Sequence, residues 1–504
     1  MHRFHHAEAE VADELAAVRP ALLSRYAAEL PGARAAVLTR LWRALAHEPL
    51  PWITGRDRDR EGLTLSLRDG RRLHGPAADP YATAAYVTAV HLDSVAYDHP
   101  ARLMTDLAVP HCVDFAAELG HSVASLALSR AGQERPADQW PAQDWEWEQR
   151  VVDGHPFHPG CRSRPGFSVA EQLAYGPEHR PRVELGMLPV RVDECLVTGV
   201  WPDDMRDGER LLLPVHPWQA AHVLKRTCDE RLTAHPLMSL RTLAVPGGPH
   251  VKTALSARLT SSVRDISLYS IALSATLSAF AESLAARSDG LLHVTRTWGA
   301  AAAESADLAA VVRESPQTYA STARGERVVP VAALATTALP ESPAWLADFT
   351  RLALTVGLRL LELGVALEAH GQNLLVVLSA TGAPLRLVYR DLADIRVSPV
   401  RLARHGIPVP DLLSGRLVTD DVTTLRRKLF GSLVAGALAG TAGSAQALGT
   451  ALETAVRDLP RTPDLRTLLQ EPLPAKALTL MRMSPGTPGD QWAQLPNPLR
   501  PQAR

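Results

Sequence analysis

The stretch that decides the fold is LEAHGQNLLVVLSATGAPLRLVYRDL, residues 367–392. Two apolar runs, Leu374–Leu378 and Leu385–Tyr389, flank a short turn that contains Gly382. Short apolar runs joined by a glycine-containing turn are typical of an antiparallel hairpin. The sequence therefore predicts a small hydrophobic hairpin with polar residues at its open end.

The open end of this hairpin carries the ligand types that a hard cation prefers. If the turn centres near Gly382, Asn373 pairs with Asp391 across the hairpin. Three further polar residues lie just outside it: Glu368, His370 and Gln372. Carboxylate and amide oxygens suit Mg²⁺, and kinase-like folds place an Asn and a metal-binding Asp around such a hairpin. We expect Glu368, Asn373 and Asp391 to hold Mg²⁺ beside ATP; the alternative is a polar hairpin mouth with internal ion pairs.

The first part of the chain, residues 1–150, is expected to be mostly helical. Helix-like apolar spacing covers Ala35–Glu48, Ala84–Tyr97 and Val113–Ala131. A hairpin is expected over Leu63–Leu73, around Asp69-Gly70. A polar stretch with Trp140, Trp145 and Trp147 marks the boundary.

The rest of the chain divides near residue 320. In residues 151–320 we expect strands over Val183–Trp201, Arg210–Val215 and Val251–Leu259, a turn at Pro246–Pro249 and a helix over Ile266–Arg287. In residues 321–504 we expect a helix over Leu346–Ala369, then the hairpin, then helices to about Met483. The Pro-rich tail after Met483 is expected to be loosely ordered.

The composition argues against some kinds of partner. Lys and Arg number 53 against 54 Asp and Glu in 504 residues, so the net charge is close to zero. This balance does not favour bulk binding to nucleic acid or to an anionic membrane. The four cysteines form no CxxC pair, and the start MHRFHHAEAE lacks the apolar core of a signal peptide. Both features predict a cytoplasmic protein.

For two uncharged stretches, a membrane-spanning helix is the alternative to a buried segment. Leu429–Leu452 has no charged residue, but it contains five glycines together with Ser, Thr and Gln. A membrane span is usually richer in Leu, Ile and Val, so we expect a small-residue helix or loop packed inside a domain. The uncharged part of Ile266–Arg287 is short and rich in Ser, so it is not expected to span a membrane.

Histidine and arginine are concentrated in Gly154–Phe167. His155, His158, Arg162 and Arg164 lie within ten residues of one another. If these side chains converge, they form an anion site, because His and Arg both donate to phosphate or carboxylate oxygens. A zinc site is less favoured, since HxxH has no third ligand nearby. The alternative is a solvated loop between domains.

A second polar cluster, Leu213–Gln219, follows a predicted strand. Its Pro-His-Pro-Trp sequence is expected to lock a corner between the strand and a helix. We expect His216 to be a satisfied structural side chain there, as buried histidines usually are.

The strand expected over Val251–Leu259 carries the third cluster. Alternation places Lys252, Ser256 and Arg258 on one of its faces. Two further candidates, from the segment before this strand, are Ser239 and Arg241.

We expect the chain to turn from this strand directly into a helix. The helix is expected to start near Ser262 or Asp265. Its expected caps are Thr260, Ser261 and Ser262. Free backbone N–H groups, hydroxyls and Arg264 at a helix start favour an anion such as a phosphate or a substrate carboxylate. The alternative is an ordinary cap with a surface arginine.

In this order, the clusters resemble the NRPS-independent siderophore (NIS) synthetases, the aerobactin-synthetase-like ligases of the IucA/IucC type. The matching stretches are GHPFHPGCRSRPGF, LPVHPWQ, SLRTL, KTALSARLTSSVR, EAHGQN and YRDL. Six stretches in order over residues 154–392 make the resemblance specific. The N-terminal region matches only by position.

The resemblance implies an α+β, cupped-hand architecture. It has a helical thumb (1–150), β-rich fingers (151–320) and a palm with kinase-like topology (321–504). The resemblance implies that ATP and Mg²⁺ activate a carboxylic acid as an acyl-adenylate, which an amine, hydroxylamine or alcohol then attacks. The acids of the family are citrate, citryl derivatives, 2-oxoglutarate and succinyl-hydroxamates. It also implies a homodimer.

The resemblance further implies roles for individual residues. Those expected to line the nucleotide and the carboxylate are His158, Ser239, Arg241, Lys252, Thr260, Arg264 and Arg313. Those expected to hold ATP and Mg²⁺ are Glu368, Gln372, Asn373 and Asp391. Arg264 and His370 are expected to meet the acyl substrate, and with His158 they are the expected catalytic residues, acting by position and charge.

The sequence departs from the family pattern at two points. The family usually has Lys where this chain has Arg162, and a compact ammonium and a forked guanidinium are not interchangeable. The chain also looks shorter than typical members, which bears on substrate choice.

Three hypotheses remain open from the sequence. The first is an adenylate-forming amide or ester ligase for siderophore biosynthesis or a related natural-product pathway. The second is a kinase-like phosphotransferase that releases ADP. The third is an ATP or carboxylate sensor without turnover. The absence of Walker A, GxGxxG and GxSxG motifs excludes the commonest alternatives.

Overall fold

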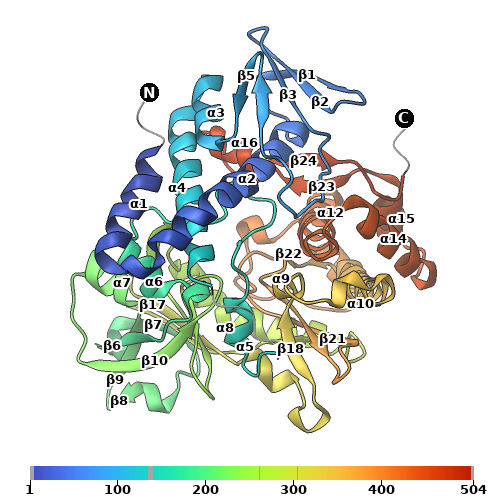
Figure 1. Cartoon of the computed structure of the whole chain (residues 1–504). Helices are drawn as coiled ribbons and strands as arrows, with labels where there is room; N and C mark the ends of the chain where they lie inside the picture. Colours follow the sequence, from blue (N-terminus) through green and yellow to red (C-terminus); the bar gives the residue numbers. More distant parts are fainter. Residues whose placement is uncertain (1–4, 134–139, 260–261, 304, 501–504) are drawn as a thin grey trace.

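The chain has an α+β fold in which helices lie beside and between several separate sheets (Figure 1). The computed structural model describes residues 5–133, 140–259, 262–303 and 305–500. The predicted fold class is confirmed. The division into three domains stays a prediction.

The N-terminal region pairs a layer of helices with an antiparallel sheet. The helices are α1 (His5–Val18), α2 (Leu23–His47), α3 (Pro100–Leu107), α4 (Cys112–Ala131) and α5 (Asp144–Gln149). The sheet follows chain order: β1 (Ile53–Arg58), β2 (Leu63–Leu67), β3 (Arg72–Gly75), β4 (Val90–Leu92) and β5 (Val95–Tyr97). The hairpin predicted over Leu63–Leu73 is confirmed, because Leu65 pairs with Leu73.

One N-terminal prediction is wrong. Ala84–Tyr97 was expected to be helical, but it contains β4 and β5. Val90 and Leu92 are buried on either side of the exposed His91, which is the two-residue period of a strand. The alanines before them gave the segment its helix-like composition.

The middle region is built on one large, mainly antiparallel sheet. Its strand order is β7-β16-β17-β12-β11-β10-β6-β9-β8. The strands are β6 (Val183–Arg191), β7 (Cys195–Gly199), β8 (Arg206–Asp207), β9 (Arg210–Val215), β10 (Glu230–Pro236), β11 (Thr242–Ala244), β12 (His250–Thr253), β16 (Thr297–Ala303) and β17 (Ala309–Arg313). The short helices α6 (Val169–Tyr175) and α7 (Pro217–Gln219) precede β6 and follow β9.

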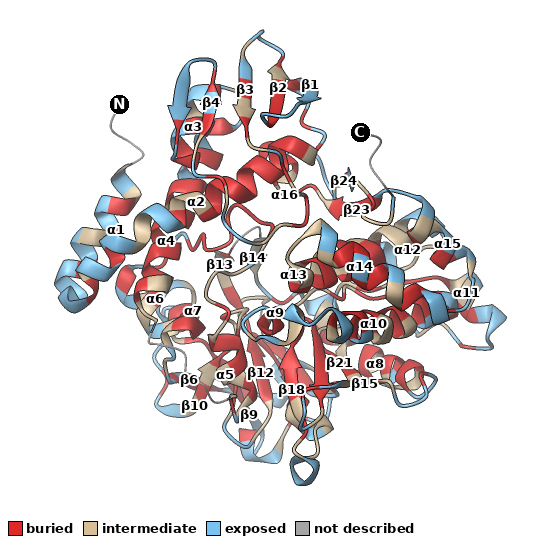
Figure 2. Cartoon of the chain, turned by 45° about the vertical axis from the view of Figure 1, so that its right-hand side comes forward, coloured by how far each residue is buried: buried red, intermediate tan, exposed pale blue. Residues whose placement is uncertain are grey.

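The strand predicted over Val251–Leu259 is interrupted. β12 ends at Thr253 in the large sheet, and β13 (Leu255–Leu259) forms a separate hairpin with β14 (Ser262–Arg264). The alternation continues through the break, so it does not reveal that the chain leaves the sheet at Ala254. As a result, Lys252 and Ser256 do not share a strand face. Figure 2 shows β13 and β14 near the middle of the molecule.

The helix predicted from residue 262 or 265 starts later. It is α8 (Leu268–Ala285), and Ser267 caps it by accepting a hydrogen bond from the Ser270 N–H. The predicted caps are therefore wrong for Ser262, which belongs to β14. Thr260 and Ser261 lie outside the described residues. Arg264 accordingly lies on a strand end and not on a helix start.

Helix α8 is long and apolar enough to cross a membrane by length and composition. In this fold it packs against β7 and β16. Its Ile271 joins a core cluster with alanines of β16, and Leu277 joins the core of the C-terminal region. The helix thus forms a layer between two sheets of one molecule.

The C-terminal region places the predicted hairpin in a small sheet. Its strand order is β15-β21-β20-β18, with β15 (Leu292–Val294), β18 (Arg327–Pro330), β20 (Leu374–Leu378) and β21 (Pro384–Tyr389). The two predicted hairpin strands are confirmed as β20 and β21. The helix expected over Leu346–Ala369 is α10 (Pro343–Leu363), which ends at Gly364 in a left-handed conformation.

The hairpin register differs from the predicted one by one residue. Leu374 pairs with Tyr389, and the Arg390 N–H donates to the Asn373 carbonyl oxygen. Asn373 is therefore opposite Arg390 and not opposite Asp391. The turn centres on Thr381 and not on Gly382, because Leu378 pairs with Pro384, and the bulge between Val377 and Leu378 offsets one of the two residues of this difference.

Helices cover the small sheet and complete the chain. They are α9 (Val331–Leu334), α11 (Pro399–Arg404), α12 (Val422–Leu429), a π-helix (Phe430–Leu438), α13 (Ala439–Ala442), α14 (Ala445–Ala455), α15 (Pro463–Gln470) and α16 (Leu478–Met483). The uncharged stretch Leu429–Leu452 is thus helical and largely buried, as expected (Figure 2). Two short strand pairs also belong to this region. β19 (Val365–Ala366) pairs with β22 (Arg396–Val397), and β23 (Leu473–Lys476) pairs with β24 (Trp492–Leu495).

The expectation of a loosely ordered tail is wrong for residues 492–496, and residues 501–504 lie outside the described part of the chain. β24 pairs with β23, and the Tyr81 hydroxyl donates to the Pro496 carbonyl oxygen. The buried side chains of Ala493 and Leu495 explain the order, because they add to two different cores. Helix α16 packs beside α2 and α4, so the C-terminal end supports the N-terminal region (Figure 1).

Candidate functional site

A cavity of about 360 Å³ collects several of the predicted site residues. Among its lining residues are Arg241, Lys252, Arg313 and Asp391, which come from three separate segments. Lys252 on β12 and Arg313 on β17 lie on one sheet face, because His250 pairs with Arg313 and residues 250 and 252 alternate to the same side. The volume is in the range typical of ligand pockets.

Lys252 is the centre of the cationic group. Its ammonium lies 2.6 Å from Asp391 Oδ2. Burial lowers the pKa of Lys252 to about 7, although Asp391 raises it, and Arg241 and Arg313 lower it further. Burial would raise the pKa of Asp391, but Lys252 and Arg313 outweigh it and hold that pKa well below its usual range. Asp391 is therefore a carboxylate facing more positive charges than it can neutralise.

The two arginines, Arg241 and Arg313, differ in which of their N–H groups have hydrogen-bond acceptors. Arg241 Nη1 donates to the carbonyl oxygens of Arg264 and Asp265, at 2.7 Å each. Burial lowers the pKa of Arg241 to about 10. Arg313 is buried, and its Nε has no hydrogen-bond partner within the described part of the chain. A buried guanidinium donor that is left unpaired is costly, so Arg313 suits an anionic ligand.

Ser239 lies two residues before Arg241 in the chain and helps to fix the position of Arg241. Its hydroxyl accepts a hydrogen bond from the Thr242 N–H, which closes the turn that carries Arg241. Leu240 in this turn has a positive φ of 61°. Ser239 thus holds Arg241 at the start of β11.

Asp391 also has a positive φ, of 70°. Asp and Asn adopt this left-handed conformation more readily than other non-glycine residues. The strained backbone directly after β21 turns the Asp391 carboxylate towards Lys252, so the residue type meets both a backbone and a charge requirement.

Several histidines share one local arrangement. In each, Nδ1 accepts a hydrogen bond from the backbone N–H two residues later; they are His99, His155, His158, His216 and His370. Four of the five precede a proline in the sequence. Since Nδ1 is an acceptor, the proton of the neutral ring is on Nε2.

His158 and His370 present such Nε2–H groups. Burial lowers the pKa of His158 to about 3, with Arg482, Arg40 and Arg264 as further causes. Burial also lowers the pKa of His370. The Nε2 of His158 is buried without a partner among the described residues. Both rings are therefore neutral hydrogen-bond donors at neutral pH.

Arg264 shares the surroundings of these histidines. Its pKa is lowered by burial and raised by Asp391 and Glu368. The only hydrogen bond from its side chain in the described structure is long, 3.5 Å from Nη2 to the Leu259 carbonyl oxygen. The guanidinium is thus positioned among charged and polar groups with most of its donors open.

Glu368 is held by lysines. Its Oε1 accepts from Lys428 Nζ at 2.8 Å and from Lys476 Nζ at 3.0 Å. Lys428 also contacts Asp394, on the other side of the hairpin. The alternative of internal ion pairs at the hairpin mouth therefore describes Oε1 of Glu368, and its expected role as a metal ligand stays a prediction.

Asn373 and Gln372 remain at the hairpin mouth. Asn373 Nδ2 donates to the Glu368 carbonyl oxygen at 3.3 Å, which leaves its amide oxygen for another group. The Gln372 carbonyl oxygen accepts from Arg390 Nε and Nη2. Over residues 5–133, 140–259, 262–303 and 305–500, no group of three or more His, Cys, Asp or Glu side chains could hold a metal ion.

The arginines of the first cluster are used inside the protein. Arg164 forms two hydrogen bonds with the buried carboxylate of Glu178, and Arg162 lies 3.5 Å from it. Arg162 also donates to the carbonyl oxygens of Val151 and Val152. The predicted anion site of two His and two Arg is not assembled in this structure, because both arginines are turned to the single carboxylate of Glu178. His155 and His158 remain available.

In the second cluster His216 was expected to be a satisfied structural side chain, but its Nε2 is buried without a partner among the described residues. His216 is buried, caps α7 by accepting from the Trp218 N–H, and lies edge-on to the Tyr175 ring. Gln219 donates to the Ser256 hydroxyl and to the Asp307 carbonyl oxygen.

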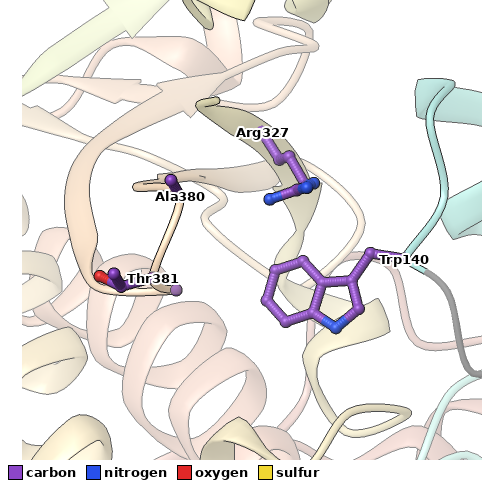
Figure 3. Close-up of a pocket in the computed structure, with 5 residues that line it drawn as sticks. Trp140, Arg327, Ala380 and Thr381 are labelled. Carbon is purple, nitrogen blue, oxygen red and sulfur yellow. The ribbon is translucent and has the colours of Figure 1, made fainter. Parts of the chain in front are cut away.

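A second, more open cavity of about 450 Å³ lies at the far tip of the β20–β21 hairpin (Figure 3). Its lining residues are Trp140, Arg327, Ala380, Thr381 and Gly382. The Arg327 guanidinium stacks over the Trp140 ring at 5.3 Å. None of the predicted site residues lines this cavity.

Sequence reasoning missed several residues around the site. Lys428 belongs to the run Arg426-Arg427-Lys428, which marks a helix end and gives no sign of a buried ion pair. Lys476 lies in the segment expected to be helical. Residues Ser414–Leu417, which line the cavity, match no sequence motif, and only the fold shows that they lie at the site.

The chain is similar to known proteins both in sequence and in structure. The model of the IucA / IucC family matches residues 144–336, and the model described as "Ferric iron reductase FhuF-like transporter" matches residues 343–487. A citryl-spermidine/3,4-dihydroxybenzoyl-citryl-spermidine:spermidine ligase of Bacillus anthracis is 24% identical over 322 residues, 49% of this chain and 51% of that protein. Staphyloferrin A synthase of Staphylococcus aureus is 20% identical over 352 residues, 58% of this chain and 59% of that protein. The matches thus span only about half to three-fifths of these relatives.

Solved structures share the fold along almost the whole chain. The petrobactin biosynthesis protein AsbB of Bacillus anthracis superimposes with a TM-score of 0.76 at 17% identity, covering 99% of this chain and 98% of that one. ATP-bound aerobactin synthetase IucA of Klebsiella pneumoniae gives 0.71 at 19% identity, covering 93% of this chain and 99% of that one. At these identities the likeness establishes the fold.

Proposed function

This chain belongs to the IucA/IucC family of NIS synthetases, and from that premise we propose that it is an ATP-dependent ligase of siderophore biosynthesis. It adenylates a carboxylic acid of the citrate, citryl or succinyl-hydroxamate type. An amine, hydroxylamine or alcohol then attacks the acyl-adenylate to give an amide or ester, with AMP released.

The observation that carries this proposal is the cationic cavity. Arg241, Lys252 and Arg313 meet one carboxylate, Asp391, so positive charge is in excess. A triphosphate supplies the missing negative charge. The unpaired Nε of Arg313 is a ready donor to one of its oxygens.

The cations match the charge that develops during adenylation. The acid's carboxylate oxygen attacks the α-phosphorus, the bond from that phosphorus to the bridging oxygen breaks, and pyrophosphate leaves with the bonding electrons. Negative charge therefore grows on the α-phosphate and on the leaving group. Fixed cations such as Lys252 and Arg313 stabilise this charge without reorganising, which is usually the largest contribution to such catalysis.

His158, His370 and Arg264 are proposed to act on the acid. Each histidine offers a neutral Nε2–H, because its Nδ1 is occupied by a backbone N–H. A neutral Nε2–H donor beside the cation of Arg264 orients a carboxylate by hydrogen bonding, without transferring a proton to it. Positioning of the reacting groups, rather than proton transfer, is then the contribution of these residues.

ATP is proposed to enter with Mg²⁺. The donor set fits the ion in part: the Asp391 carboxylate and the free amide oxygen of Asn373 are the oxygen ligands that Mg²⁺ takes. One oxygen of each carboxylate is already paired, Asp391 Oδ2 with Lys252 and Glu368 Oε1 with Lys428 and Lys476, so each offers its other oxygen to the ion. The ion, when bound, neutralises charge on the phosphates, and we place Asp391 and Asn373 next to it.

The remaining features of the proposal rest on the family resemblance. They are a homodimeric assembly, a cytoplasmic location, and small-molecule acid and amine partners. Size-exclusion chromatography with light scattering tests the assembly independently of activity.

The function is tested by separating the products of ATP. The purified protein is incubated with ATP, Mg²⁺, hydroxylamine and one acid at a time: citrate, succinate, 2-oxoglutarate or a succinyl-hydroxamate. The expected result is pyrophosphate and AMP in equal amounts, dependent on one class of acid. Acid-dependent ADP would instead make the protein a phosphotransferase, and ATP binding without any product would make it a sensor.

A further inference from the structure

Helix α5 (Asp144–Gln149), only six residues long, connects the large sheet of the middle region to the small sheet of the C-terminal region. Its Trp145 ring stacks on the His235 ring of β10, with the centroids 4.7 Å apart. Its Trp147 is buried in the core of the C-terminal region, and the helix packs beside β18 (Figure 2). Since β10 and β18 belong to different sheets, α5 is held by both.

Two buried carboxylates, Asp144 and Glu148, lie on one face of α5, because they are four residues apart. An ionised carboxylate is costly to bury unless it is paired, and a buried pair seldom stabilises a fold more than apolar packing does. Two such groups on one short helix favour a role in fixing geometry over a role in stability.

Asp144 anchors α5 to the two strands that carry cations of the cavity. Its Oδ2 lies 2.6 Å from His250 Nε2 and accepts a hydrogen bond from the Ser315 hydroxyl at 3.0 Å. His250 is on β12, two residues before Lys252, and Ser315 follows Arg313 of β17 by two residues. These contacts fix the position of α5 relative to both cations.

Glu148 joins α5 to the other two segments of the cavity. Its Oε1 lies 2.6 Å from Arg390 Nη1, and its Oε2 accepts from the Met238 N–H at 2.8 Å. Arg390 directly precedes Asp391, and Met238 lies three residues before Arg241. One carboxylate thus contacts both the end of the hairpin and the turn that carries Arg241.

Arg390 connects the position of Glu148 to that of Asp391. Its backbone N–H donates to the Asn373 carbonyl oxygen, and its Nε and Nη2 donate to the Gln372 carbonyl oxygen. The third nitrogen, Nη1, lies against Glu148. A displaced Glu148 would therefore shift Arg390 and, with it, the neighbouring Asp391.

We propose that Glu148 is a positioning residue that holds the Asp391 carboxylate against Lys252. Glu148 is not among the described residues that line the cavity, so it acts through Arg390 and not on the ligand. The proposal deepens the proposed function and rests on it, because it assumes that Asp391 acts on MgATP. The contacts close a ring that runs through Lys252, Asp391, Arg390, Glu148, Asp144 and His250.

A double-mutant cycle with Asp391 tests this role. Glu148→Gln keeps an oxygen for the Met238 N–H, but it removes the charge that pairs with Arg390. Pyrophosphate release is expected to fall about 30-fold, because small displacements of reacting groups have large effects on rate. Asp391→Asn alone is expected to lower it by a factor on the order of 10². If Glu148 acts through Asp391, the double variant is slower than Asp391→Asn by less than about three-fold.

Losses that multiply would overturn the proposal, since independent effects would slow the double variant by a factor on the order of 10³ or more. Normal pyrophosphate release by Glu148→Gln would overturn it as well. Arg390→Lys breaks the same link from the other side, because one ammonium cannot reach both Glu148 and the Gln372 carbonyl oxygen. It provides a second cycle with Asp391→Asn should Glu148→Gln fail to fold, and the same lack of additivity is expected.

Asp464→Asn is the matched control. Asp464 is a buried carboxylate on α15 that pairs with Arg401 and Arg426, and none of these three is among the residues that line the cavity. Its variant is expected to have a lower melting temperature but normal pyrophosphate release below that temperature. A loss of release in Asp464→Asn as large as in Glu148→Gln would show that lost stability alone explains both, against the proposal.

The same cycle is also measured as MgATP affinity by calorimetry, which needs no turnover. The affinity losses of Glu148→Gln and Asp391→Asn are again expected not to multiply, and multiplied losses would overturn the proposal. An unmodified chain that binds MgATP but releases no pyrophosphate with any acid would refute the proposed function, while the affinity cycle would still decide whether Glu148 acts through Asp391.

Discussion

The Lys252 ammonium lies 2.6 Å from Asp391 Oδ2, across 139 residues of sequence. This contact joins the large sheet of the middle region to the residue that follows the β20–β21 hairpin. Lys252 and Asp391 do not form an isolated, charge-balanced ion pair, because the positive charges of Arg241 and Arg313 also act on Asp391. The contact therefore defines a site that needs a further anion.

The first prediction concerns the pH dependence of ATP binding. With its pKa lowered to about 7 by burial, Lys252 loses its proton as the pH rises through neutrality. The charged form binds the triphosphate, so MgATP affinity is expected to fall between about pH 6 and pH 8 as that proton leaves. Calorimetry in two buffers of different ionisation enthalpy should show proton uptake on binding near pH 7.5.

Lys252→Arg is the control for this dependence. A guanidinium stays charged over the same range, so the proton uptake is expected to disappear while binding persists. Any titration of ATP itself would remain in the variant. Affinity of the unmodified chain that is constant from pH 6 to pH 8 would contradict the assignment.

Asp391 is predicted to be needed for turnover and for the left-handed backbone conformation at its position. Asp391→Asn keeps a residue that tolerates a φ of 70° but removes the charge, so turnover is expected to fall by a factor on the order of 10² or more with the fold retained. Asp391→Ala removes both and is expected to lower the melting temperature as well. Near-normal pyrophosphate release by Asp391→Asn would remove Asp391 from the site.

The hairpin itself was predictable because its information is local. Leu374–Leu378, the turn and Leu385–Tyr389 lie within sixteen residues, and apolar runs around a glycine suffice to specify them. The one-residue register error arose because the turn centres on Thr381 and a bulge follows at Val377 and Leu378, and no composition signal marks either feature. Local patterns thus give elements more reliably than they give pairings.

The candidate site was predictable only through the resemblance. Nothing in the spacing of Lys252 and Asp391 says that they meet, since the distance along the chain is long and the contact depends on how two sheets pack. The same holds for Glu368, whose partners Lys428 and Lys476 lie 60 and 108 residues away. These ion pairs were not predictable from the sequence, and the metal role that ligand type suggested for Glu368 stays a prediction.

Failures at Ala84–Tyr97 and in the tail have a common cause. Both segments take their order from distant partners: β4 pairs with β3, and β24 pairs with β23. Composition reports the intrinsic preference of a segment, and tertiary context overrides it.

Arg264 is predicted to contribute to the acid and not to the nucleotide. Its open donors lie near His158 and Glu368. Arg264→Ala is expected to lower acid-dependent turnover by a factor on the order of 10², with MgATP affinity changed by less than about five-fold. Steady-state kinetics with varied acid and calorimetry with MgATP measure the two effects.

Arg191→Ala is the matched control, because Arg191 is exposed and pairs only with Asp193 and Glu194 at the surface. It is expected to leave both measurements unchanged. A loss of MgATP affinity in Arg264→Ala as large as its loss of turnover would instead place Arg264 on the phosphates.

Arg162 is predicted to matter for stability. Its guanidinium donates to the Val151 and Val152 carbonyl oxygens and lies beside Glu178. Arg162→Lys restores the residue usual in the family, but one ammonium cannot reach all three acceptors. The free energy of unfolding is expected to fall by about 1–3 kcal/mol, with the apparent affinities for ATP and acid unchanged. A changed acid affinity at equal stability would give Arg162 a substrate role.

His158 allows its two ring nitrogens to be tested separately. Nδ1 accepts from the Gly160 N–H, and Nε2 is the donor proposed for the acid or phosphate. Asn reproduces the Nδ1 position and also accepts from a backbone N–H two residues later, whereas Gln reproduces the Nε2 position. His158→Asn is therefore expected to keep the melting temperature and to lose turnover by a factor on the order of 10².

His158→Gln is expected to show the opposite pattern. It loses the turn hydrogen bond, which lowers the melting temperature, but its amide N–H retains part of the turnover. Thermal unfolding and pyrophosphate release on the same preparations compare the two variants directly. Since the ring is already neutral with a pKa of about 3, neither variant should change the pH profile of turnover above pH 5. Full turnover in His158→Asn would show that Nε2 donates to nothing that reacts, and His158 would then be a turn residue like His216.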